Sequence, residues 1–317
     1  MRGAPVEVVH HASADAREAT QRSGRGIAWH SKTLPGEGAI VTVEFSAVEF
    51  SGEYRAILET VPVAPGARIA TESVVYEHVA GAGAEGGAGT AVGPSGERTG
   101  LEGYLAYDAA LIDPRPAVLI VHDWTGVDPN VQMRAQMLAR LGYVALAADV
   151  YGKGVRPTGD AASAQARKYY ADLPLLRERV QAGYRRLVTD PRVDPDRIAV
   201  IGYCFGGSAT LEFARTGAPL RGAVSIHGGL TVHEPSDASA IRASLLVLTG
   251  AADPVVPDTA IAAFKDELRA VPSIDWQIVS YSGAPHAFTV PGSDRYRPVA
   301  DARSWRALVD FLDEVLA

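Results

Sequence analysis

The sequence predicts an α/β protein built on a mostly parallel sheet with helices on both of its faces. From Leu101 onward, short apolar runs alternate with longer segments whose apolar residues have the spacing of helices. The run Ala117–Val121 is apolar throughout, which is typical of a strand buried on both faces of a sheet. At 317 residues the chain is long enough to bury a core of this size.

The first part of the chain is predicted to be an extension, residues 1–70, ahead of an α/β domain that spans residues 71–317. Residues 1–36 are polar and loosely patterned, which is typical of a flexible arm. Apolar and polar residues alternate over Ala39–Phe50, and a second strand is expected over Tyr54–Val63. We therefore expect a β-hairpin within a partly flexible extension.

The same two patterns place the remaining elements of the domain. Pro174 is expected to break or restart a long helical segment, because proline removes a backbone donor. The further strands are expected at Glu72–Val79, Leu101–Tyr107, Tyr143–Ala147, Ile198–Ile201, Arg221–Ile226, Ser244–Thr249 and Trp276–Tyr281. The helices are expected at Asn130–Leu141, Ala161–Val188, Pro257–Ala270 and Ala300–Leu316.

Composition argues against several functional classes. The net charge of −7 argues against nucleic acid as the main partner, and no apolar run is long enough to span a membrane. The N-terminus lacks the apolar core of a secretory signal. A single cysteine excludes an intrachain disulfide and any multi-cysteine metal site. These features predict a cytoplasmic protein whose lone thiol is free for chemistry.

The segment Arg197–Arg215 passes from an apolar strand through a glycine-rich turn into helical spacing. Within it, Gly202–Gly206 has the form G-x-C-x-G, with cysteine where a nucleophile elbow more often has serine. Glycines flank the central residue because bulky neighbours would clash in so tight a turn. Cys204 is then expected at a helix N-terminus, where backbone N–H groups favour negative charge. A buried structural cysteine is the alternative.

A nucleophile needs a base, and the base needs a carboxylate that orients it. In α/β-hydrolase proteins the chain order is nucleophile, acid, histidine. Asp253 follows the strand that ends at Thr249, and His286 follows the strand that ends at Tyr281. Both are therefore expected at the carboxyl edge of the sheet, together with Cys204. Their order and placement predict a catalytic triad, although each alone could be a helix cap or a loop residue.

From about Glu72 to the C-terminus, the chain resembles the dienelactone hydrolase family of α/β-hydrolases. The similar segments are GYCFGG, GAADPVVP and SGAPHAF, together with LEGYLAYD, VHDWTG and ADVYGKG. The family hydrolyses lactone or ester bonds through a cysteine thiolate, a histidine and an aspartate. The resemblance implies that Cys204 is the nucleophile, that His286 is the base and then the acid, and that Asp253 orients His286.

The resemblance also implies roles for residues around the thiol. The oxyanion hole would be formed by the backbone N–H groups of Trp124 and Phe205. Asp123 takes the place of a carboxylate, often glutamate in the family, that lies near the resting thiol. A role in an Asx-type turn is the alternative for Asp123.

The substrate pocket departs from the family pattern. Well-studied members hold a substrate carboxylate with arginines, one of them a few residues after the catalytic histidine. Here Thr289–Pro291 contains no arginine, so Arg295 and Arg297 are the candidates, with a solvated surface role as the alternative. The family resemblance therefore does not extend to dienelactone itself as the substrate. The other expected wall residues are Trp124, Tyr203, Phe205, His227 and Phe288, for which core packing is the alternative.

The predicted function is hydrolysis of a lactone or a small carboxylic ester through a thioester acyl-enzyme. The expected partner is a small-molecule ester or lactone, and this chemistry requires no metal or organic cofactor. A general carboxylesterase acting on small esters is the alternative among enzymes. A non-catalytic α/β-hydrolase-fold binding protein with a redox-sensitive thiol is the alternative outside them. These patterns do not specify the oligomeric state.

Overall fold

The computed structural model describes residues 30–33, 40–43, 49–80, 96–233 and 235–317, which fall into two compact units, 1–45 and 46–317. In the first unit, β1 (His30–Thr33) pairs antiparallel with β2 (Ile40–Val43). A hairpin is present, and β2 lies within the predicted strand Ala39–Phe50. Its partner is β1, which precedes it in the chain, and not the predicted segment Tyr54–Val63, which follows it. Most of the predicted flexible arm lies outside the described residues.

The predicted strand Tyr54–Val63 is wrong, because the structure has a helix, α2 (Gly52–Leu58), at this place. The reason lies in the spacing of the apolar residues. Tyr54, Ile57, Leu58 and Val61 recur at intervals that put them on one face of a helix. This spacing is that of a helix and not the alternation of two that a half-buried strand requires.

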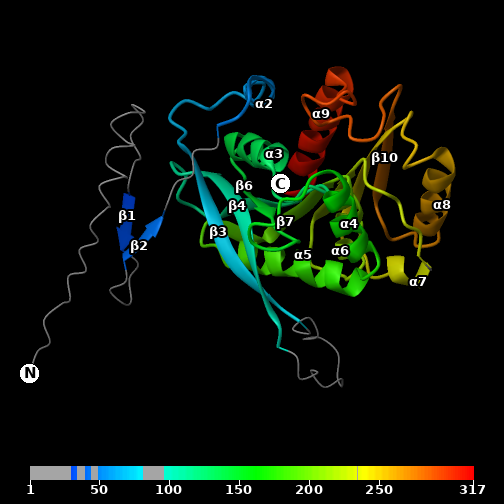
Figure 1. Ribbon diagram of the computed structural model, residues 1–317, viewed down its shortest axis with the longest axis horizontal. Coiled ribbons are helices and arrows are strands. Elements are labelled where there is room, and N and C mark those ends of the chain that lie inside the picture. The colour runs from blue at the N-terminus through cyan, green and yellow to red at the C-terminus, as the bar shows by residue number, and fades with distance from the viewer. Residues whose placement is uncertain (1–29, 34–39, 44–48, 81–95, 234) are drawn as a thin grey trace, which may run out of the picture. The chain divides into compact units, whose positions relative to one another are not determined.

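The second unit contains an eight-stranded sheet. Its strands are β3 (Ile69–Val79), β4 (Arg98–Asp108), β5 (Arg115–Val121), β6 (Val144–Ala148), β7 (Val193–Tyr203), β8 (Gly222–Ile226), β9 (Ser244–Gly250) and β10 (Trp276–Tyr281). Their order across the sheet is β10-β9-β8-β7-β5-β6-β4-β3 (Figure 1). The strands from β10 to β6 run parallel, whereas β4 pairs antiparallel with both β6 and β3. The predicted mostly parallel sheet is confirmed.

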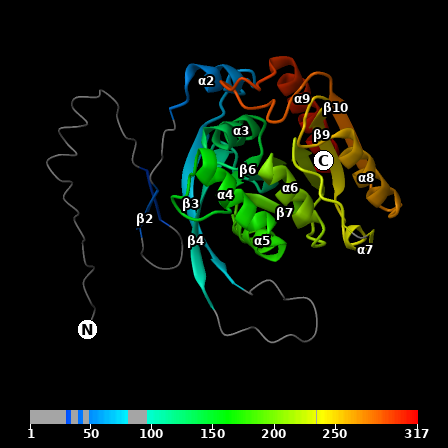
Figure 2. The same cartoon turned by 45° about the vertical axis from the view of Figure 1, so that its right-hand side comes forward.

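Helices cover both faces of this sheet (Figures 1 and 2). One face is covered by α3 (Pro129–Arg140) and α9 (Pro298–Val315). The other face is covered by α4 (Gly159–Tyr170), α5 (Leu173–Val188), α6 (Phe205–Ala214) and α8 (Asp258–Arg269), and a single turn, α7 (Pro235–Ala238), precedes β9. The predicted break at Pro174 is confirmed, since α4 and α5 are separate helices. None of the helices in the described ranges combines the length and the apolar character that crossing a membrane requires.

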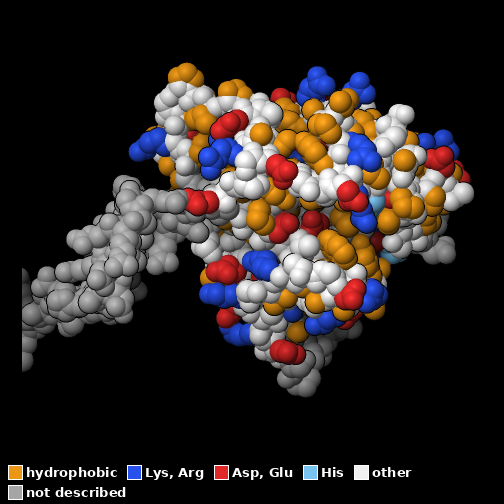
Figure 3. Space-filling view, turned by 45° about the horizontal axis from the view of Figure 1, so that its top comes forward, with side chains coloured by type: hydrophobic (Ala, Val, Ile, Leu, Met, Phe, Trp, Pro, Cys, Tyr) orange, Lys and Arg blue, Asp and Glu red, His pale blue; other side chains and the backbone are white. Residues whose placement is uncertain are grey.

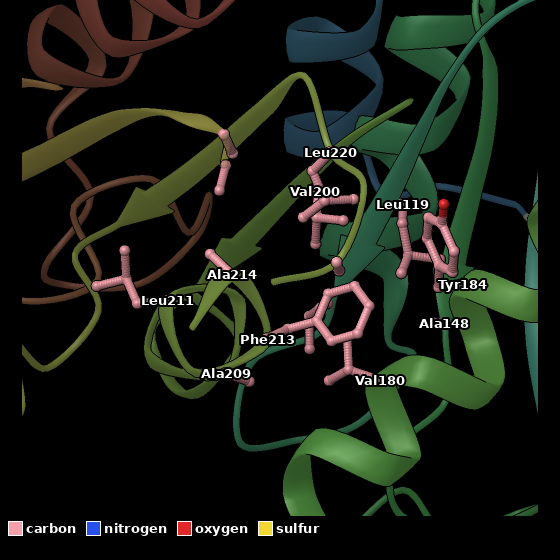
Figure 4. Packing of buried hydrophobic residues seen from close by; sticks show 14 of the residues in the cluster. Leu119, Ala148, Val180, Tyr184, Val200, Ala209, Leu211, Phe213, Ala214 and Leu220 are labelled. Atoms are coloured by element: carbon pink, nitrogen blue, oxygen red, sulfur yellow. The ribbon is translucent and has the colours of Figure 1, made fainter. Parts of the chain in front are cut away.

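Alternate residues of the central strands face two separate apolar layers. In β5, Leu119 faces the layer formed with α5 and α6, whereas the next residue, Ile120, faces the layer formed with α3 and α9. Both residues are fully buried, which explains why this strand is an uninterrupted apolar run. Figure 4 shows the first layer, where Val200 of the sheet lies near Val180 of α5 and Phe213 of α6. The sheet is therefore a rigid base whose carboxyl edge carries the loops described next.

Candidate active site

Cys204 lies in the turn between the last residue of β7 and the first residue of α6. Its backbone φ is 53° and its ψ is −113°, a conformation that costs a non-glycine residue about 1–3 kcal/mol. The turn is as tight as the glycine pattern predicts. A Cβ on Gly202 would lie 2.0 Å from the carbonyl oxygen of Gly206, and a Cβ on Gly206 would lie 2.1 Å from that of Val121. Only glycines at these two positions allow the thiol to stand at the sheet edge.

The structure brings the three predicted triad residues together from three loops. The sulfur of Cys204 lies 3.0 Å from Nε2 of His286, and Nδ1 of His286 lies 2.9 Å from Oδ2 of Asp253. Asp253 follows β9 and His286 follows β10, so the neighbouring strand ends set their distance. The side chain of Asp253 is fully buried and that of His286 is 12% exposed, whereas Cys204 is half-buried.

The carboxylate of Asp253 fixes the proton on the imidazole of His286. Its Oδ1 accepts the backbone N–H groups of Val255 and Val256, at 2.8 and 3.3 Å, which holds Oδ2 toward the ring. Because an ionised carboxylate can only accept, Nδ1 of His286 must be the donor in the bond to Oδ2. Nε2 therefore faces the sulfur and is the nitrogen that can exchange a proton with it.

The pKa of His286 is raised to about 9. Burial alone would lower this pKa, but hydrogen bonds to Asp253 and Cys204 and the charges of these two groups outweigh it. For Asp253, burial acts to raise the pKa, yet the pKa is lowered because His286 and two backbone N–H groups stabilise the carboxylate. At neutral pH the site therefore holds a positively charged imidazole beside an ionised carboxylate.

His227, at the end of β8, links the elbow to the loop that carries His286. Its Nδ1 accepts the N–H of Cys204 at 3.1 Å, a donor that it shares with the carbonyl of Ile226 at 3.0 Å. Its Nε2 lies 2.8 Å from the hydroxyl of Thr289. Burial, followed by the charge of His286, lowers the pKa of His227 to about 3, so the ring is neutral and Nδ1 keeps its lone pair.

The two residues whose backbone N–H groups are predicted to form the oxyanion hole lie near Cys204. Phe205 is the first residue of α6, so its N–H has no carbonyl of a preceding helical turn to bind. Trp124 lies in the loop after β5 and borders the same cavities as Cys204. Within the part of the chain that the structure describes, neither N–H donates to a protein acceptor.

The carboxylate of Asp123 is bound within its own loop. Its Oδ1 accepts the backbone N–H of Thr125 at 2.8 Å and the hydroxyl of Thr125 at 2.5 Å. This is the Asx-type turn that the sequence left as an alternative. The side chain nevertheless borders the same cavity as Cys204.

Two cavities meet at the sulfur–imidazole pair, and Cys204, His286 and Trp124 border both of them. The smaller cavity has a volume of 350 Å³, and its walls include Arg167, Tyr170, Phe205, Ser208, Thr231 and Val255. The larger cavity has a volume of 460 Å³, and its walls include Asp123, Asp128, His227, Val290, Ser293 and Arg295. A further hollow of 570 Å³ lies at the opposite edge of the sheet, beside the amino ends of β8 and β9, remote from the thiol.

The sequence profile of the family described as "Dienelactone hydrolase family" matches residues 101–316. The chain belongs to the dienelactone hydrolase family. This family member is 28% identical over 229 residues to a Bradyrhizobium protein named "Probable 2-oxo-3-(5-oxofuran-2-ylidene)propanoate lactonase". That match covers 68% of this chain and 90% of the relative.

Solved structures agree with the family assignment. A dienelactone hydrolase-like promiscuous phosphotriesterase from metagenomic libraries is 34% identical, with a TM-score of 0.68, over 78% of this chain and 99% of that one. A puromycin-hydrolysing peptidase of Mycobacterium tuberculosis is 20% identical, with a TM-score of 0.54, over 71% of this chain and 39% of that one, and shares the fold alone. The predicted family, the α/β-hydrolase fold and the class of carboxylic ester or lactone hydrolase are confirmed.

The predicted pocket residues of this dienelactone hydrolase family member divide into two groups. His227 and Arg295 border the larger cavity. Tyr203 and Phe288 are buried in the apolar layer under α3 and α9. Arg297 donates to the carbonyls of Asp294 and Tyr296 in its own loop, at 2.9 and 3.0 Å. Tyr203 and Phe288 are therefore core residues, whereas the exposed Arg297 is a surface residue, and none of the three borders either cavity.

Some wall residues were not expected from the sequence. Arg167 and Tyr170 of α4 border the smaller cavity, and Asp128 at the start of α3 borders the larger one. Helical spacing predicted both helices but does not say which of their ends reaches the sheet edge. In the described ranges, no group of three or more His, Cys, Asp or Glu residues is arranged to hold a metal ion.

Proposed function

We propose that this dienelactone hydrolase family protein cleaves a lactone or a small carboxylic ester by nucleophilic catalysis with Cys204, His286 and Asp253. The observation that carries the proposal is the hydrogen-bonded row of sulfur, imidazole and carboxylate, with distances of 3.0 and 2.9 Å. This row lies where two cavities meet. A substrate with its acyl part in one cavity and its alcohol part in the other would therefore have its ester bond beside the sulfur.

In the first half-reaction, the Cys204 thiolate attacks the carbonyl carbon and forms a carbon–sulfur bond. The carbonyl electron pair moves to oxygen, where the N–H groups of Phe205 and Trp124 stabilise it. When this pair returns, the carbon–oxygen bond of the ester breaks. The departing alkoxide takes the proton from Nε2 of His286, which leaves a thioester on Cys204 and a neutral imidazole.

In the second half-reaction, Nε2 of His286 takes a proton from water as the water oxygen attacks the thioester carbon. The tetrahedral adduct collapses, the carbon–sulfur bond breaks, and the thiolate of Cys204 leaves. His286 is again protonated and the carboxylic acid product departs. Asp253 holds the ring in one tautomer and stabilises its positive charge, without itself accepting the proton.

A thiolate suits activated esters and strained lactones, because their alkoxide leaving groups can depart from the tetrahedral adduct in competition with the thiolate. An amine is a poorer leaving group than a thiolate, so the adduct of an amide would return to reactants. The general carboxylesterase remains the alternative among hydrolases. The relative described as a promiscuous phosphotriesterase adds a phosphotriester to the substrates worth assaying.

The test is a panel of lactones, activated esters and one phosphotriester, with mass spectrometry to detect an acyl group on Cys204. The wild-type protein should turn over at least one ester or lactone and show a mass increase equal to the acyl group. Cys204→Ala should abolish both. Turnover that survives this substitution would refute the proposed nucleophile.

Cys204→Ser is the matched variant, because it keeps the geometry and changes only the acidity of the nucleophile. A hydroxyl is far less acidic than a thiol, so we expect kcat to fall by a factor of about 10²–10⁴. Full activity in this variant would contradict a thiolate mechanism.

The mechanism also bears on the compartment. The lone thiol must remain reduced to act, which a reducing environment ensures. The cytoplasm is therefore the proposed location.

A further inference from the structure

A cluster of charged side chains lies buried between α6 and α8. Glu212 and Arg215 belong to the end of α6 and Glu267 belongs to α8, and each of the three is at most 5% exposed. On the surface that Figure 3 shows, by contrast, charged side chains of both signs are interspersed where water can solvate them. Because burying charges is costly, such a cluster is weak evidence for stability alone. Its contacts show what else it holds, since several of them lead to residues 229–233, the β8 loop.

The carboxylates and guanidinium groups of the cluster are paired. Arg215 donates from two nitrogens to Oε1 of Glu267, at 3.1 and 2.9 Å, and from Nη1 to Oε1 of Glu212 at 3.1 Å. Arg177 of α5, which is partly exposed, donates to Oε2 of Glu212 at 2.7 Å. Two carboxylates therefore face two guanidinium groups, and charge-assisted hydrogen bonds fix each of them in position.

The cluster also binds the β8 loop. Nη2 of Arg215 donates to the carbonyl of Thr231 at 3.1 Å. The backbone N–H of His233 donates to Oε2 of Glu267 at 3.3 Å, and Nε2 of the His233 ring lies 2.7 Å from Oε1 of Glu212. The loop is therefore held through its backbone and through one side chain, by groups that are themselves fixed.

The β8 loop forms part of the wall of the smaller cavity beside Cys204. Gly229 and Thr231 border this cavity. The carbonyl of Gly229 accepts the hydroxyl of Ser208 at 3.0 Å, and that hydroxyl lies 3.4 Å from the hydroxyl of Tyr170, which also borders the cavity. A displacement of the loop would therefore change the shape of the cavity.

The other walls of the smaller cavity are mostly apolar, and they include Trp124, Ala166, Tyr170, Phe205 and Val255. The charged groups on its border are the exposed Arg167, the protonated His286 and the reacting thiolate of Cys204, and none of the described carboxylates borders it. His286 and Cys204 take part in the reaction itself, and solvent screens the charge of Arg167. The space beyond the sulfur therefore suits an uncharged, apolar group.

We propose that Arg215 and His233 are positioning residues that fix the β8 loop and so make the smaller cavity a rigid subsite for an apolar arm of the substrate. The inference rests on the proposed ester hydrolysis at Cys204. An arm gains most from a wall that is already in place, because binding then requires little further ordering. At 350 Å³, the cavity has room for an alkyl chain or a phenyl ring.

The test follows the hydrolysis of three activated esters in a pH-stat. Vinyl acetate is small at both ends, vinyl hexanoate has a long acyl arm, and phenyl acetate has a ring on the alcohol side. His233→Ala removes the side-chain anchor of the loop. For at least one of the two larger esters, KM should rise by about three- to tenfold with kcat nearly unchanged, whereas vinyl acetate should react as before. Equal effects on all three esters, or no effect on any, would overturn the proposal.

Arg177→Ala is the matched control for His233→Ala. It removes another partner of the same Glu212 carboxylate, but the described hydrogen bonds of Arg177 go to Glu212 and not to the loop. KM for all three esters should stay at the wild-type values. His233→Gln keeps an amide nitrogen that can donate to Glu212, and it should recover part of the loss. An equal rise of KM in Arg177→Ala, or no recovery in His233→Gln, would refute the positioning role of His233.

Arg215→Lys tests the second positioning residue without leaving the buried carboxylates of Glu212 and Glu267 uncompensated. Lysine keeps the positive charge but lacks the planar fork that binds Glu267 and the carbonyl of Thr231 together. We expect the same ester to show a selective rise of KM. Wild-type KM values for all three esters, or a uniform fall of kcat, would exclude Arg215 from this role.

A binding measurement separates this inference from the proposed function. Cys204→Ala cannot form the thioester, so an NMR titration with hexanamide and acetanilide, unreactive analogues of the two larger esters, measures the subsite alone. One of them should bind more tightly than acetamide, and adding His233→Ala should raise its Kd by about three- to tenfold. This result without turnover by the wild-type protein would refute the hydrolase and keep the subsite. Turnover without this binding selectivity would keep the hydrolase and refute the subsite.

Discussion

At the scale of single residues, the charge state of His286 is set by its two neighbours. The ring is mostly buried, which by itself favours the neutral form, yet its pKa is about 9 because Asp253 and Cys204 both favour the positive charge. His227, one ring away with centroids 5.4 Å apart, is held neutral in the same region. Of these two histidines in contact, His286 is therefore positively charged and His227 is neutral at neutral pH, so only His286 can supply a proton to the leaving group.

The pH dependence of kcat/KM should reflect the raised pKa of His286. The proton that leaves with the alkoxide is lost as pH rises through about 9, so the rate should fall above that pH. Asp253→Asn removes one of the causes of the raised pKa, so the falling limb should move to lower pH in that variant. A limb that stays in place in Asp253→Asn would contradict the assignment to His286.

His227 is expected to act as a positioning residue for the elbow. His227→Leu removes the acceptor for the Cys204 N–H, and we expect kcat to fall about tenfold with little change in KM, which corresponds to about 1.4 kcal/mol. His227→Asn, which retains an acceptor near the position of Nδ1, should recover part of this loss. Equal kcat values for the two variants would show that the hydrogen bond does not matter.

At the scale of elements, the elbow depends on how closely α6 approaches β5. Gly206→Ala would push a methyl group to 2.1 Å from the carbonyl of Val121, and we expect a loss of at least about 3 kcal/mol in the free energy of unfolding. Gly100→Ala in β4 is the matched control, because a Cβ there meets nothing within 4 Å. Urea unfolding measures both, and similar values for the two variants would refute the packing argument.

The sequence predicted strands and helices well where periodicity and burial agree, and less well elsewhere. The uninterrupted run of β5 has few alternatives, because only a strand buried on both faces is apolar throughout. In α2, by contrast, seven residues permit two periods, and the contacts with Met133 and Met137 that select the helix come from distant sequence. Short segments are decided by tertiary packing, which local spacing does not contain.

The same reasoning explains which site residues could be predicted. Asp253 and His286 each follow a strand, and parallel strands bring their carboxyl ends to one edge, so topology alone places them near Cys204. The cavity walls depend on the rotation of α4 and on the path of the loop after His286. Tyr203 and Arg297 show the limit of predicting cavity walls from position in the chain. Tyr203 directly precedes Cys204 but is buried in the core, and Arg297 follows Arg295 by two residues but binds a carbonyl of its own loop.

At the scale of the whole molecule, one buried ion pair joins the two helices on the α3–α9 face to the active-site loop. Arg134 of α3 donates to Asp301 of α9 at 2.6 Å and to the carbonyl of Thr289 at 3.1 Å. Both charged side chains are almost completely buried. The same guanidinium therefore holds α3 to α9 and also holds the loop that carries His286 in place.

Breaking this pair should be costly, because it leaves a buried charge without a partner. Asp301→Asn is expected to lower the free energy of unfolding by about 3–5 kcal/mol. Asp266→Asn is the matched control, since its ion pair with Arg269 is exposed and should contribute less than about 1 kcal/mol. A comparable loss of Tm in both variants would contradict the distinction between buried and exposed pairs.

The chain's single cysteine stands at the junction of two hollows and is partly open to solvent. A maleimide dye therefore has only one atom to label, and the ratio of dye to protein counts the molecules whose pocket is open. Any compound that occupies either hollow should slow the labelling. The protein thus carries its own reporter, and unknown ligands can be screened by fluorescence before any product is identified.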